Sequence, residues 1–207
     1  MNKPLIVLSA TPLLITALAT FAGSAVDLSV KGAITPNACE SVLSGGGVID
    51  FGKMSAKELD PDKFTELPQQ ALHLSVRCEG ATLFILSTID NRAGTSALRP
   101  TWHGLGMTPN DEKLGSARFG LYNAVADTRA VRTITSLDGG ITWAPSSYLG
   151  HYMLTAIAAA DGVDLPIAVK EFDAELRLAT HIVPSGDLTL IDEIPIDGSA
   201  TLQLKYL

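Results

Sequence analysis

The chain ends with the stretch Gly198-Ser-Ala-Thr-Leu-Gln-Leu-Lys-Tyr206-Leu207. Apolar or aromatic residues at positions 200, 202, 204 and 206 alternate with polar residues, which is the period-two pattern of a half-buried β-strand. Chain ends usually fray. A strand that reaches the last residues therefore needs a stable partner, and we expect the C-terminal strand to pair within a sheet.

The same alternation recurs along the rest of the chain. It is clearest in residues 72–78 and 172–178, and shorter candidates, including residues 48–52 and 188–191, bring the total to roughly nine strands separated by turns. Residues 148–159 are apolar and fit either a strand or a helix. No long region has the 3.6-residue period of an amphipathic helix. The sequence therefore predicts an all-β sandwich.

The first 25 residues have the layout of a secretory signal peptide. Lys3 is followed by a long uncharged and mostly apolar stretch, and small residues close it at Gly23-Ser24-Ala25. We expect cleavage after Ala25 and export of the remaining chain, with an uncleaved membrane anchor as the alternative. No second apolar segment is long enough to cross a bilayer, so we expect no transmembrane segment after cleavage.

Composition and motifs disfavour several classes of function. The 207-residue chain carries a formal net charge of −7 and no basic cluster, so we expect no binding to nucleic acid. The four histidines are widely separated, and neither a nucleophile elbow nor a phosphate-binding loop is present. We therefore expect no enzymatic activity, no catalytic or metal-binding residues and no cofactor.

The chain has two cysteines, Cys39 and Cys78. Exported proteins meet an oxidising compartment, so an even pair predicts one disulfide, with two free thiols as the alternative. A bridge that closes a loop of this length would stabilise the fold by roughly 4 kcal/mol in the chain-entropy model.

Directly after the predicted cleavage site comes another alternating strand, Val26-Asp-Leu28-Ser-Val30-Lys-Gly32-Ala-Ile34-Thr. It has few of the charges and none of the prolines that protect an exposed sheet edge. Such a strand can complete the sheet of another molecule, with its apolar residues buried and Gly32 where backbones approach closely. The alternative is that it pairs within its own domain, with Gly32 at a bulge.

Three groups of residues resemble the subunits of chaperone–usher pili, or fimbriae. Residues 28–34 followed by Cys39 resemble the N-terminal extension of these subunits, and residues 48–52 and 72–78 resemble their second strand and the strand with the partner cysteine. The C-terminal alternation that begins at Gly198 resembles their C-terminal motif. The long middle of the chain is more specifically similar to a family of exported fimbria-like proteins of uncharacterised function.

The resemblance implies an immunoglobulin-like, pilin-type β-sandwich that is incomplete and is completed by a donor strand. It implies three kinds of partner: a periplasmic chaperone, an outer-membrane usher and neighbouring pilus subunits. The implied donor-strand positions are Leu28, Val30, Gly32 and Ile34. The implied positions of the C-terminal, chaperone-pairing strand are Gly198, Ala200, Leu202, Leu204 and Tyr206.

The expected organisation is a signal peptide (1–25), a donor-strand extension (26–37) and a sandwich domain (38–207) with a central insertion near 91–115. The expected function is a structural subunit of a chaperone–usher surface fibre, assembled by donor-strand exchange and supporting adhesion at the cell surface. The alternative is a self-contained secreted β-sandwich that binds a glycan or small ligand through residues 91–115, where Arg99, Trp102 and His103 would be the contacts.

Overall fold

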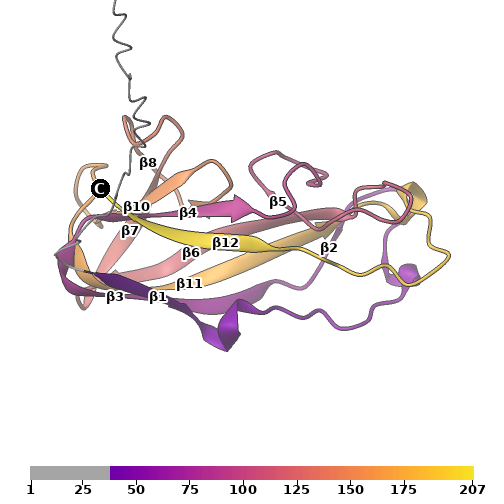
Figure 1. Cartoon of the computed structure of the whole chain (residues 1–207), viewed down its shortest axis with the longest axis horizontal. Helices are drawn as coiled ribbons and strands as arrows, with labels where there is room; N and C mark the ends of the chain where they lie inside the picture. Colours follow the sequence, from indigo (N-terminus) through magenta and orange to yellow (C-terminus); the bar gives the residue numbers. More distant parts are fainter. Residues whose placement is uncertain (1–37) are drawn as a thin grey trace, which may run out of the picture. The chain divides into compact units, whose positions relative to one another are not determined.

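The computed structural model describes residues 38–207, which belong to one compact unit, Thr35–Leu207. The predicted signal peptide and the predicted donor strand, with Leu28, Val30, Gly32 and Ile34, lie outside the described residues. The described part of the chain consists of β-strands, three short 3-10 turns and loops, without an α-helix (Figure 1). The prediction of an all-β fold is therefore confirmed, and the ambiguous residues 148–159 form two strands, at 148–149 and 154–159, and no helix.

The eight main strands are β1 (Cys39–Leu43), β3 (Gln70–Thr82), β4 (Phe84–Asp90), β6 (Gly115–Ala126), β7 (Arg129–Ser136), β10 (Leu154–Ala159), β11 (Val169–Ile182) and β12 (Ala200–Tyr206). Four two-residue strands extend them: β2 (Thr65–Glu66), β5 (His103–Gly104), β8 (Ala144–Pro145) and β9 (Tyr148–Leu149). The 3-10 turns are η1 (Ser44–Gly47), η2 (Ala56–Glu58) and η3 (Ser185–Asp187).

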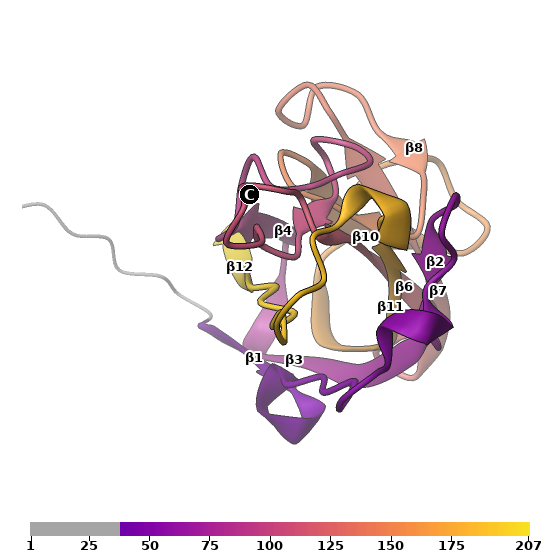
Figure 2. The same cartoon turned by 90° about the vertical axis from the view of Figure 1, so that its right-hand side faces the viewer.

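The strands form one antiparallel sheet that curls until it is nearly a barrel. Their order is β1-β3-β11-β6-β7-β10-β4-β12. The sheet turns at β6, which pairs with β11 along most of its length and with β7 only at Val125 and Ala126. Seen end-on, the strands surround a common interior, and β1 and β12 border the same side of it (Figure 2). These two strands are the ends of the sheet.

Alternation along the long strands builds the core. In β3, Leu74 and Val76 are fully buried, and in β11 Phe172 is fully buried too. The ring of Phe84 from β4 meets Phe172 edge-on, with 6.4 Å between the ring centroids. Ser75 in β3 and Asp173 in β11, next to these inward positions, are only partly buried because successive side chains of a strand point to opposite faces. The long predicted strands were therefore placed correctly.

The predicted strands at 48–52 and 188–191 are wrong. Gly45, Gly46, Gly47 and Gly52 all have positive φ, which turns the backbone away from an extended path. The Asp50 carboxylate also accepts a hydrogen bond from the Gly52 N–H at 2.7 Å, which fixes a local turn in place of sheet pairing. Residues 188–191 follow η3 and pair with no strand in the described part of the chain.

Candidate functional site

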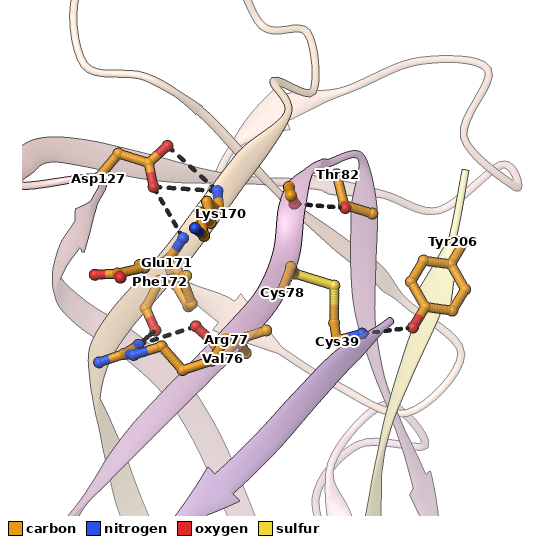
Figure 3. The surroundings of a disulfide bond; sticks show 11 residues. Cys39, Val76, Arg77, Cys78, Thr82, Asp127, Lys170, Glu171, Phe172 and Tyr206 are labelled. Carbon is orange, nitrogen blue, oxygen red and sulfur yellow. Dashed lines mark hydrogen bonds between the residues drawn. A yellow bond between two sulfur atoms is a disulfide. The ribbon is translucent and has the colours of Figure 1, made fainter. Parts of the chain in front are cut away.

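The candidate site is a groove between β1 and β12. Within residues 38–207, β1 pairs with β3 alone and β12 pairs with β4 alone, so each has one edge without a strand partner. At one end the Cys39 N–H donates a hydrogen bond of 2.9 Å to the Tyr206 hydroxyl, which ties the two strands together (Figure 3). Away from this contact the two strands are joined by no sheet pairing.

The groove has a volume of about 800 Å³ and is lined mainly by aliphatic side chains. Leu43 and Leu72 line it from the side of β1 and β3, and Leu176 and Leu178 of β11 line its floor. Leu202 of β12 and the preceding Ile194 and Ile196 line the other side. A groove of this kind leaves apolar surface in water, and an apolar occupant would remove it.

Two segments that fail to form strands line the groove instead. Ile49 and Phe51 pack against the buried cluster that includes Leu178 and Ile182, and both line the groove. Leu188 and Leu190 line it from the opposite end of the chain. The alternating pattern of these segments therefore predicted correctly that each has an apolar side. That side faces the groove, and the segments do not pair in the sheet.

The groove is not uniformly apolar, because polar and charged residues also line it: Asp50, Lys53, Thr88, His103, Thr180, Asp192, Glu193 and Ser199. The His103 ring is 2% exposed, and its Nε2 lies 3.0 Å from the Thr88 hydroxyl. Burial lowers the pKa of His103 to about 4. The negative charge of Asp90 acts to raise this pKa, and the nearby His151 acts to lower it. His103 is therefore a neutral interior residue, and the expectation that it lies on a ligand-binding surface loop is wrong.

A disulfide joins Cys39 of β1 to Cys78 of β3, as the sequence predicts (Figure 3). The two residues are direct partners in the register of the β1–β3 pair. Cys39 also makes the contact with Tyr206, so the covalent bond anchors the end of the groove at which β1 and β12 meet. This bond fixes a short strand that, within residues 38–207, pairs with one neighbour in the sheet.

The predicted C-terminal positions lie at the groove or beside it. Ala200 and Leu202 line the groove, and the preceding Gly198 does so too. Leu204 packs against the main core, and Tyr206 is partly exposed and bonds to Cys39. The structure therefore brings these residues together along the free edge of β12. Sequence reasoning missed the floor residues Leu176 and Leu178, whose alternation indicated only that they are buried.

Two negative findings apply to residues 38–207. No group of three or more histidine, cysteine, aspartate or glutamate side chains is arranged to hold a metal ion. No helix in this part of the chain has the length and apolar character needed to cross a membrane.

Within residues 38–207, the fold and the groove define a class: a disulfide-bonded, all-β protein whose curled sheet has no strand pairing across one groove. The family model described as "Protein of unknown function (DUF1120)" matches residues 28–102. Protein GltF of Escherichia coli (strain K12) is 27% identical over 237 aligned positions, which cover 92% of this chain and 93% of that protein. Uncharacterized protein YhcF of the same organism is 25% identical over 235 positions, covering 94% and 98%. The expected similarity to proteins of uncharacterised function is therefore confirmed.

Proposed function

We propose that this chain is a structural subunit of a chaperone–usher surface fibre that assembles by donor-strand exchange. The observation that carries the proposal is the apolar groove between the two edge strands of a sheet that is otherwise nearly closed. In this proposal the curled sheet is an immunoglobulin-like, pilin-type sandwich that lacks its last strand. The extension at residues 26–37 of a neighbouring subunit supplies that strand.

The chemistry of the proposed donor suits the groove. Leu28, Val30 and Ile34 share one face of an extended strand and would cover the apolar lining. The free edge of β12 would pair with the donor backbone, which gives affinity, while the side chains give specificity. Burying a large aliphatic side chain is worth about 1.5–3 kcal/mol, so three such residues would contribute roughly 5–9 kcal/mol before the cost of ordering.

The proposal also assigns partners before assembly. A periplasmic chaperone would cover the groove and pair with the C-terminal strand at Gly198, Ala200, Leu202, Leu204 and Tyr206. An outer-membrane usher would then exchange the chaperone for the next subunit, and the fibre would support adhesion at the cell surface. Export would depend on the signal peptide at residues 1–25.

The test is thermal unfolding of residues 38–207, produced in the periplasm, with increasing amounts of a peptide of residues 26–37. A matched peptide with Leu28→Asp and Val30→Asp serves as the control. We expect the natural peptide to raise the melting temperature in a saturable way, because a ligand that binds only the folded state stabilises it. A cooperative transition that neither peptide shifts would contradict the proposal.

A further inference from the structure

A second and smaller pocket, of about 330 Å³, lies on the other face of β6 from the groove. Ala117 and Phe119 line the groove, and Arg118, between them in the strand, lines the small pocket. The pocket is also lined by Arg99 and Trp102 from the loop before β5 and by Tyr148 of β9. The two cavities share no lining residue, so the small pocket is independent of the groove.

Two arginines that line this pocket, both exposed to solvent, have no carboxylate partner in the part of the chain that the structure describes. Four of the seven arginines are ion-paired there: Arg77, Arg92, Arg132 and Arg177. Of the other three, Arg99 and Arg118 line the same pocket, and Arg129 lies outside it. In a chain with a net charge of −7, two unpaired cations beside one cavity favour an anionic ligand.

Aromatic and hydroxyl groups lie beside these cations. The guanidinium carbon of Arg118 is 5.5 Å from the centroid of the Trp102 ring, and Trp102 contacts His181 with 5.4 Å between ring centroids. Burial raises the pKa of Tyr148, while a hydrogen bond with Thr101 and the charges of Arg118 and Arg99 act in the opposite direction. Tyr148, Arg99 and Arg118 all line this pocket, so one ligand bound there could meet all three side chains.

The walls of the pocket are fixed by the fold. In the loop, the Arg99 carbonyl accepts hydrogen bonds from the Ser96 hydroxyl at 2.8 Å and from the Trp102 N–H at 3.0 Å. The Thr101 carbonyl accepts one from the His151 N–H at 3.0 Å. A Cβ at Gly150 would lie 3.0 Å from the Thr101 carbonyl oxygen, so glycine is what lets the loop pack closely against the turn after β9. Binding would therefore need little rearrangement of the backbone.

We propose that this pocket binds the carboxylate of an acidic sugar. A guanidinium matches the planar carboxylate with two parallel hydrogen bonds, and Arg99 and Arg118 supply two such groups. The hydroxyls of Thr101 and Tyr148 can pair with sugar hydroxyls, and the apolar Trp102 and Met153 suit the C–H surface of a sugar ring. The volume is near the lower end for small-ligand sites, which suits one or two sugar rings.

The test is titration of the full exported chain with galacturonic acid and N-acetylneuraminic acid, followed by calorimetry or NMR. Galactose has the ring without the carboxylate, and acetate has the carboxylate without the ring. We expect saturable binding of at least one acidic sugar, about tenfold or more tighter than that of either control compound. Binding of neither acidic sugar, or equal binding of acetate or galactose, would overturn the proposal.

Two variants test whether the acidic sugar binds in this pocket. Arg118→Gln is expected to weaken binding of the acidic sugar about tenfold or more, because it removes a charge-assisted contact. Arg129→Gln makes the same charge change at an exposed arginine outside the pocket and is expected to leave the affinity unchanged. Thermal unfolding of both variants checks that they are folded. An equal loss of affinity in the two folded variants would show that net charge, and not this pocket, attracts the ligand.

Discussion

The charge state of the buried His103 depends on the fold. Burial lowers its pKa from 6.5 to about 4, so the unfolded state binds more protons than the folded state between these pH values. The contribution of neutral His103 to the free energy of unfolding is therefore complete above pH 6.5. As the pH falls toward 4, this free energy decreases by about 3 kcal/mol. We expect urea unfolding to show this loss between about pH 7.5 and about pH 4.5, and His103→Gln to reduce it. An unchanged loss in the variant would show that another group titrates.

At the scale of elements, β1 depends on its covalent bond to β3. It has five residues and one strand neighbour among residues 38–207, and the disulfide closes a loop whose ends are 39 positions apart. We expect the double variant Cys39→Ser, Cys78→Ser to lower the free energy of unfolding by about 4 kcal/mol in denaturant titrations. Tyr206→Phe is the control, because it removes the hydrogen bond to Cys39 and leaves the disulfide in place, and it is expected to cost about 1 kcal/mol. Equal losses would mean that the disulfide adds nothing beyond this contact.

At the scale of the whole molecule, the proposed strand exchange predicts how copies of the chain meet. If residues 26–37 of one copy fill the groove of the next, the contact is head-to-tail and does not close, so chains of increasing length form. We expect light scattering after size exclusion to show a series of oligomers for residues 26–207 and monomers for residues 38–207. A single monomeric species of the longer chain at every concentration would mean that the extension pairs within its own domain.

Particular residues show which features of the structure could be predicted from the sequence. The alternation around Leu74 and Phe172 predicted buried faces correctly, since a strand has only two faces and the pattern assigns each side chain to one. Residues 48–52 and 188–191 have the same pattern and form no strand, because positive-φ glycines and local turns compete with pairing. His103 was misplaced because a short strand inside a polar loop carries almost no periodic signal.

The sequence by itself determined the all-β class, the long strands and the disulfide pair, since these follow from local periodicity and from the count of cysteines. Only the tertiary structure decided that β1 and β12 border one groove, that Leu176 and Leu178 line its floor, and that Arg99 and Arg118 share a pocket. These features join segments far apart in the chain. Their positions depend on sheet order and curvature, which local alternation of apolar and polar residues does not encode.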